Sequence, residues 1–172
     1  AGRNVLVIDG QSGHLERLPP ASAREHRLEL HARVKCGTDP EPAPASFRVA
    51  ADGFPDYALR AVARVAKAHQ QNLPLLAADF RLAAGTFLLG KQSFTPVSKL
   101  EEGFTWQAEG SCLGLVSREP GRWSLRAPFW LPKEWELALQ PRTTRLFLNQ
   151  GYPLTLEEEI EFELPPGARP LA

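Results

Sequence analysis

The chain contains no methionine and only two cysteines, Cys36 and Cys112. Two cysteines are too few for a disulfide scaffold, and these two lack the C-x-x-C spacing of a zinc site. We expect both to be buried thiols, with a Cys36–Cys112 disulfide as the alternative in an oxidising compartment. The lack of methionine leads us to expect that the start was removed by processing, or that these residues were excised from a longer protein.

The chain also has no excess of either charge and no long apolar run. Lysine plus arginine number 20, and aspartate plus glutamate number 20, which argues against a polyanionic partner. No apolar run approaches the roughly 20 residues that span a bilayer, and the N-terminus lacks the pattern of a signal peptide. We therefore expect no nucleic-acid binding and no membrane insertion.

Motifs for metals and cofactors are missing as well. The four histidines have no i, i+4 spacing on a predicted helix, and no acidic cluster completes a zinc set. The glycines of residues 85–90 are not followed by the lysine and serine or threonine of a phosphate-binding loop. The sequence predicts no metal and no cofactor.

Alternation of apolar and polar residues predicts half-buried strands at residues 28–36 and 154–164. In the second of these, Ile160, Phe162 and Leu164 face the core, whereas the other parity carries Glu157, Glu159, Glu161 and Glu163 into water. Glu158 breaks the apolar face, which we attribute to a bulge or a strand end. The apolar residues 5–8 before Asp9-Gly10 predict a strand that begins a hairpin.

The middle of the chain has a helical pattern. Residues 56–69 are rich in alanine, with Leu59 and Val62 as anchors, Asp56 as the cap and Arg60 on the exposed side. A second helix is predicted for residues 74–84, and a loop with three prolines for residues 37–45.

Several short strands surround this helical segment. They are predicted at residues 47–49, 86–89, 104–108, 112–116, 123–127 and 145–148. The count favours a mainly β fold, an antiparallel β-sandwich with a helical insertion at about residues 56–84. A length of 172 residues is suited to a single domain over residues 1–172.

Cys112, within Gly110-Ser111-Cys112-Leu113-Gly114, is the residue that most resembles a nucleophile. A catalytic cysteine needs a helix N-terminus that lowers its pKa and a histidine that takes its proton. Gly114 and the following turn oppose a helix there, and all four histidines precede Cys112, the reverse of the order in papain-like and transglutaminase-like folds. We interpret Cys112 as a core thiol and expect no enzymatic activity.

The four tryptophans divide into two pairs. Trp106 and Trp123 follow strand parity and are predicted in the core. Trp130 and Trp135 lie beside prolines, where a bridging loop could leave them on a binding surface for a glycan or a peptide.

The order of elements resembles a known family. The similarity rests on Asn4 to Asp9, Gly13, Leu18-Pro19, residues 28–36, Gly53, Leu59-Arg60, and Tyr152-Pro153-Leu154 through Leu164-Pro165-Pro166-Gly167. These segments resemble the β domain that follows the transglutaminase-like core in bacterial envelope proteins with an uncharacterised β-sandwich domain before that core.

The resemblance implies a non-catalytic C-terminal accessory domain, because nothing in the chain matches the Cys, His and Asp motif of such a core. It also implies a periplasmic or outer-envelope location, and the transglutaminase-like core or another protein domain as the partner. The alternative function is a carbohydrate- or peptide-binding β-sandwich module that uses exposed aromatic residues. An independent cysteine enzyme is the third hypothesis.

Overall fold

The computed structural model of the chain is mainly β. It describes residues 4–10, 12–17, 19, 22–37, 41–68, 74–119, 122–133 and 153–168. Within these ranges the helical elements are α1 (Phe54–Ala68) and two 3₁₀ turns, η1 (Ala23–Glu25) and η2 (Leu75–Ala78). The mainly β class with a helical insertion, consistent with a β-sandwich, is confirmed.

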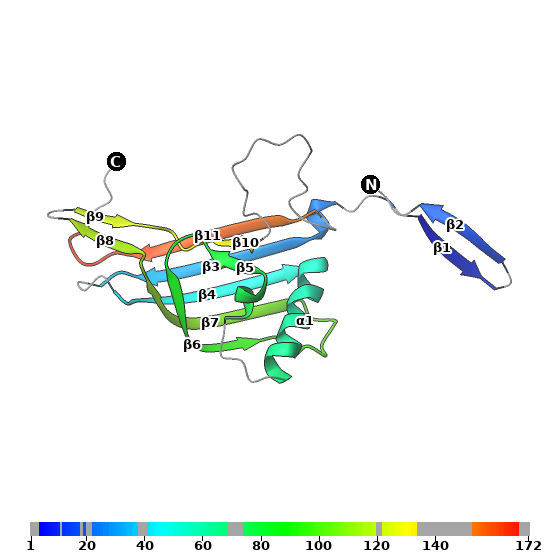
Figure 1. The fold of residues 1–172 in the computed structure, drawn as a ribbon, viewed down its shortest axis with the longest axis horizontal. Helices are drawn as coiled ribbons and strands as arrows, with labels where there is room; N and C mark the ends of the chain where they lie inside the picture. Colours follow the sequence, from blue (N-terminus) through cyan, green and yellow to red (C-terminus); the bar gives the residue numbers. More distant parts are fainter. Residues whose placement is uncertain are drawn as a thin grey trace.

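The centre of the fold is a five-stranded sheet in the order β11, β3, β4, β7, β6 (Figure 1). Its strands are β3 (Arg27–Lys35), β4 (Ala43–Asp52), β6 (Thr86–Phe94), β7 (Phe104–Leu113) and β11 (Thr155–Glu163). β11 runs parallel to β3, whereas the other neighbours are antiparallel. A strand near the end of the chain therefore lies along one edge of a sheet built from much earlier residues.

Three two-stranded sheets account for the other described strands. They pair β1 (Asn4–Asp9) with β2 (Ser12–Arg17), β5 (Phe80–Leu82) with β10 (Trp130–Pro132), and β8 (Val116–Glu119) with β9 (Arg122–Leu125). The β1–β2 hairpin, which the sequence predicts, lies apart from the body at the right of Figure 1. The β8–β9 hairpin lies at the opposite end.

The five-stranded sheet buries one face, because alternate residues of a strand point to opposite sides. The largest fully buried side chains on its strands are Leu28, Leu30, Val34, Phe47, Val49, Phe104 and Trp106. Leu59 and Ala63 of α1, Leu75 and Leu76 of η2, and Trp130 of β10 belong to the same core cluster. The helix, the 3₁₀ turn and the β5–β10 pair thus form a second layer over the apolar face.

Helix α1 differs in detail from the sequence prediction. Its buried anchors are Leu59 and Ala63, whereas Val62 is only partly buried. Asp56 lies inside the first turn rather than at the cap, and Arg60 is buried rather than exposed. Arg60 is buried because its charge is paired: it binds Asp56 and the backbone carbonyls of Pro96 and Glu102.

Three further segments were predicted wrongly. The helix expected at residues 74–84 is a single 3₁₀ turn followed by β5, because Phe80–Leu82 pairs with Trp130–Pro132. The loop expected at residues 37–45 ends earlier, since β4 begins at Ala43 and includes Pro44. Cys112 belongs to β7 rather than to a separate strand. The strand expected at residues 145–148 lies outside the described residues.

The assignment of faces in the last strand is confirmed. Glu157, Glu159, Glu161 and Glu163 of β11 are exposed, whereas Ile160 and Phe162 pack against the core but, like Leu164, are only partly buried. The bulge proposed at Glu158 is absent from the described ladder, since β11 pairs with β3 without a register shift from Thr155 to Glu163. Glu158 instead accepts a hydrogen bond from the backbone N–H of Trp130 at 3.0 Å.

Candidate functional site on the polar face of the sheet

The two cysteines lie in the core as separate thiols. Both Cys36 and Cys112 are free and buried. Cys36 follows β3 and Cys112 lies on β7, with β4 between the two strands. Strands two apart in a sheet are separated by about 9 to 10 Å, beyond the reach of a disulfide. The Cys36–Cys112 disulfide is therefore not formed.

The environment of Cys112 is unsuited to a nucleophile. Burial raises the pKa of the Cys112 thiol to about 12 and also raises the pKa of Cys36. The attacking species of a cysteine enzyme is the thiolate, which a raised pKa disfavours. These pKa shifts support the interpretation of Cys112 as a packing residue.

The expectation of Trp130 on a binding surface is contradicted. The Trp130 side chain is 3% exposed, and its ring packs edge-on against Phe47 and Trp106, with centroids 5.8 and 6.4 Å away. β10 turns the ring inward because it pairs with β5 above the apolar face of the sheet. Trp135, the other tryptophan of that prediction, lies outside the described residues. Trp106 is buried as predicted, and Trp123 is partly buried.

The face of the sheet opposite the core carries charged side chains in cross-strand rows. Four pairs join β3 to β11 and form what we call the charged ladder. They are Arg27–Glu157 at 2.6 Å, His31–Glu159 at 3.0 Å, Arg33–Glu161 at 2.9 Å and Lys35–Glu163 at 3.0 Å. Three of the pairs are direct partners in the parallel register, whereas Arg27 lies opposite Thr155 and reaches diagonally to Glu157. Because these side chains are exposed, each pair contributes at most about 1 kcal/mol.

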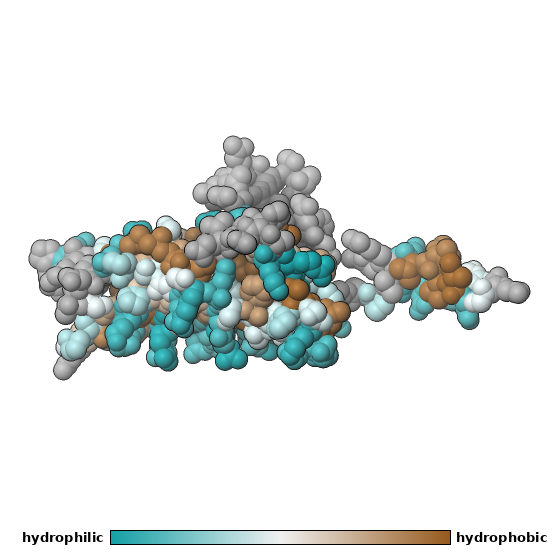
Figure 2. Space-filling view, turned by 90° about the horizontal axis from the view of Figure 1, so that it is seen from below, coloured by the Kyte–Doolittle hydropathy of each residue, from teal (hydrophilic) through white to brown (hydrophobic). Residues whose placement is uncertain are grey.

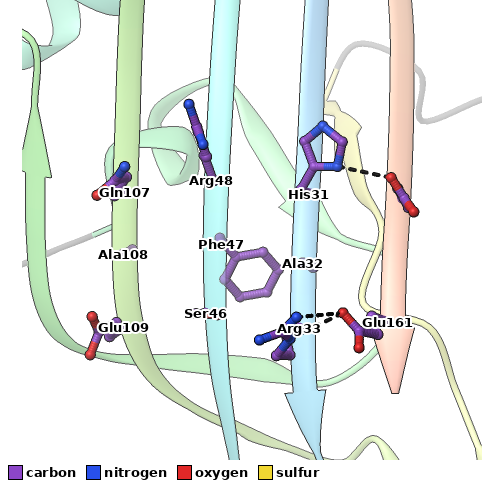
Figure 3. Close-up of a pocket in the computed structure, with 11 residues that line it drawn as sticks. His31, Ala32, Arg33, Ser46, Phe47, Arg48, Gln107, Ala108, Glu109 and Glu161 are labelled. Carbon is purple, nitrogen blue, oxygen red and sulfur yellow. Dashed lines mark hydrogen bonds and ion pairs between the residues drawn. The ribbon is translucent and has the colours of Figure 1, made fainter. Parts of the chain in front are cut away.

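Beside the ladder, the polar face is hollowed above β4. A depression of about 400 Å³ is lined by His31 and Arg33 of β3, Ser46 and Arg48 of β4, and Gln107 and Glu109 of β7, among others (Figure 3). A second depression of about 630 Å³ continues past Ser46 to Pro44, Gly90 and Gly110. The two share Arg33, Ser46 and Glu109, and together we call them the β4 trough.

Small residues, Pro44 and Ser46 of β4, form part of the floor of the β4 trough. The charged ladder stands on one side of them and the Lys91–Glu109 pair, at 3.0 Å, on the other. Because the trough runs along a strand, its shape is suited to an extended chain lying along β4.

The β1–β2 hairpin exposes a second kind of surface. Leu6, Ile8 and Leu15 are 63, 73 and 74% exposed, and Leu6 lies opposite Leu15 in the register. Figure 2 shows this apolar surface on the hairpin at the right, and hydrophilic side chains along one side of the body. An isolated two-stranded hairpin is marginally stable in water, so an apolar face on one favours a contact.

The described residues contain no group of three or more histidine, cysteine, aspartate or glutamate side chains that could hold a metal ion. No helix among them is long and apolar enough to cross a bilayer.

Sequence reasoning missed the residues of the β4 trough. Pro42 and Pro44 concealed the start of β4, so the alternation that places Ser46 and Arg48 on the polar face was only partly visible. Gln107 and Glu109 follow the alternation of β7, which could have identified them. Comparison of the chain with protein-family models, with curated proteins and with solved structures gave no match.

Proposed function

We propose that the chain is a non-catalytic interaction domain that holds an extended segment of a protein partner in the β4 trough. The observation that carries this proposal is the trough itself, an open channel along one strand with Pro44 and Ser46 on its floor, Arg48 on the same strand, and charged walls. Polar and charged groups on such a surface provide specificity and orientation more than affinity.

The environment of the thiols supports a non-catalytic role. Cys112 is buried with a raised pKa, and the carboxylates of the trough each lie beside a basic side chain of a neighbouring strand. Such pairs stabilise a fixed surface and leave each carboxylate beside a cation rather than poised for proton transfer.

The resemblance described above gives this domain a context. In that context the chain is the C-terminal accessory domain of a transglutaminase-like protein in the periplasm or outer envelope, and the core of that protein is the partner. The exposed apolar face of the β1–β2 hairpin supports a contact with a further domain, because Leu6, Ile8 and Leu15 are exposed together.

The alternative as a glycan-binding module receives less support than peptide binding. Sugar rings commonly stack on exposed aromatic rings. The aromatic residue that lines the β4 trough is Phe47, whose side chain is 2% exposed and points into the core. Peptide binding therefore fits the trough better.

The experiment that tests the proposal fills the trough. Ser46→Tyr places a large side chain on its floor, and Ser117→Tyr makes the same change on the exposed surface of β8. Both variants and the parent are incubated with an immobilised library of extended peptides. The peptides that bind are then released, and their masses are measured by mass spectrometry. We expect the parent and Ser117→Tyr to retain a common set of peptides of unchanged mass, and Ser46→Tyr to lose it.

Three results would overturn the proposal. They are retention of the same peptides by a folded Ser46→Tyr protein, failure of the parent to retain any peptide, and release of peptides that have been covalently changed. Near-UV circular dichroism of each variant establishes that the fold is intact.

A further inference from the structure

Arg48 is the cation of the β4 trough that has no carboxylate partner among the described residues. The other basic side chains of the trough are all paired: His31 with Glu159, Arg33 with Glu161, Lys35 with Glu163 and Lys91 with Glu109. Arg48 is exposed at the middle of β4, the central strand of the sheet. The arginine and lysine side chains of the walls each lie beside a carboxylate, whereas Arg48 places a positive charge over the floor without one in the described part of the chain.

Hydrogen-bonding side chains flank this charge. Arg48 lies opposite Gln107 of β7 and opposite His31 of β3 in the register, so the three form one row across the sheet (Figure 3). His31 Nδ1 is engaged with Glu159 Oε2 at 3.0 Å, which leaves its other ring nitrogen for a ligand. The Gln107 amide is a donor, and the Arg48 guanidinium presents a planar fork that matches a carboxylate.

We propose that Arg48 is the specificity-determining residue of the trough and binds the carboxylate of an aspartate or glutamate side chain in an extended peptide. This inference rests on the proposed function of the trough. It adds the chemistry that selects the ligand: an isolated acidic residue placed over β4.

The surrounding charges restrict the ligand to a single carboxylate. Glu109 lies on the next row of the same face, and Glu159 and Glu161 stand on the opposite wall. A polyanion would bring further negative charges close to these carboxylates, and like charges repel. A peptide with one acidic residue avoids that repulsion.

The test uses two capped hexapeptides of serine and threonine that differ at one central residue, glutamate in one and glutamine in the other. Each is titrated into the full, isotopically labelled chain, and backbone amide shifts report both the location and the dissociation constant. We expect shifts along β4 and a two- to five-fold tighter binding of the glutamate peptide, which is the range for exposed charge pairs. The ratio of the dissociation constants of the two peptides should fall toward one in roughly 1 M salt.

Variants assign the preference to Arg48. In Arg48→Gln the two peptides should bind equally, and Arg48→Lys should keep a reduced preference because it retains the charge and loses the fork. Arg64→Gln, which removes an exposed arginine of α1, should leave the preference unchanged. A preference that persists in Arg48→Gln would overturn the assignment.

The outcomes also separate this inference from the function on which it rests. Shifts along β4 with equal affinity for both peptides would overturn the carboxylate specificity and leave the peptide-binding function standing. A lack of shifts on the sheet face would overturn both. A methyl glucuronide that moves the same amides at lower concentration than the glutamate peptide would assign the site to an acidic sugar and overturn the peptide.

Discussion

The guanidinium of Arg60 binds the carboxylate of Asp56, one turn earlier in α1, and the same carboxylate accepts a hydrogen bond from the backbone N–H of Phe104 at 2.9 Å. Arg60 is 3% exposed and lies 5.5 Å from the centroid of the Phe104 ring. Its remaining donors reach the carbonyls of Pro96 and Glu102. This pair therefore joins the helix to the start of β7 and to the loop before it.

Arg60→Ala should destabilise the protein by about 3 kcal/mol, because removal of one partner leaves the other charge buried without compensation. Arg64→Ala, at an exposed position of the same helix, should change the free energy of unfolding by less than about 0.5 kcal/mol. Urea denaturation followed by tryptophan fluorescence measures both. Equal stability of the two variants would show that the Arg60–Asp56 pair is not a structural link.

The environment of Glu158 leads us to expect a loss of stability as the pH rises. Its carboxyl group is partly buried on the apolar side of β11, and burial raises its pKa to about 7, an effect opposed by the hydrogen bond from the Trp130 N–H. Between about pH 4.5 and pH 7 the native state holds a proton that the unfolded chain has lost, so the free energy of unfolding falls through this range. We expect a decrease of about 2 kcal/mol, smaller than the full difference between the two pKa values because solvent screens a partly buried carboxyl group, and complete once the pH exceeds the folded pKa.

Glu158→Gln should remove this part of the pH dependence, since the amide oxygen still accepts the Trp130 hydrogen bond and carries no proton to lose. Glu101→Gln, at an exposed turn position, is the matched control and should follow the parent. Thermal unfolding at a series of pH values compares the three proteins. A Glu158→Gln profile that parallels the parent from about pH 5 to pH 8 would contradict the assignment.

The thiols provide a third prediction. Because Cys36 and Cys112 are buried and have raised pKa values, neither should react with iodoacetamide in the native protein at about pH 8, and both should react after unfolding. The labelling is done without a reductant, and mass spectrometry counts the labels on each chain. Two labels on the native chain would contradict the burial, and an unfolded chain that takes none until it is reduced would indicate a disulfide.

Prediction from the sequence was most accurate for strands with one solvent-exposed face and one buried face. Leu156, Ile160 and Phe162 alternate with glutamates, so the faces of β11 were assigned correctly. The prediction of a helix for the segment that begins at Leu75 was wrong because the structure of this segment depends on residues far away in the sequence. The Leu75 N–H donates to Gln92 Oε1 at 3.2 Å, and the following residues pair with β10. Local propensity contains no information about such contacts.

The candidate site was missed for a related reason. Arg48 and Gln107 are unremarkable in their own segments, and they become neighbours only through the register of β4 with β7. A site made of alternate residues on several strands cannot be assembled until the strand order is known. Burial of Arg60 escaped prediction likewise, since the carbonyls that bind it come from residues 96 and 102.

Gly110 gives the last prediction, because it couples the floor of the β4 trough to the core. It lies on β7 opposite Leu89, beside the register shift between Leu89 and Lys91. A Cβ at this position would lie 2.1 Å from the backbone oxygen of Leu88 and 2.9 Å from the Phe87 ring. That ring is itself held against Phe47 at 4.8 Å between centroids, so it has little freedom to move away.

Gly110→Ala should therefore cost about 2 kcal/mol or more and should weaken peptide binding in the trough, because β6 and β7 must separate to admit the methyl group. Gly103→Ala is the control, since its Cβ would meet no atom closer than 3.8 Å. Chemical denaturation and peptide titration measure the two effects. If the Gly110→Ala protein is as stable as the Gly103→Ala protein, β6 does not approach β7 closely at Leu88. The description of the trough floor next to Gly110 would then also be wrong.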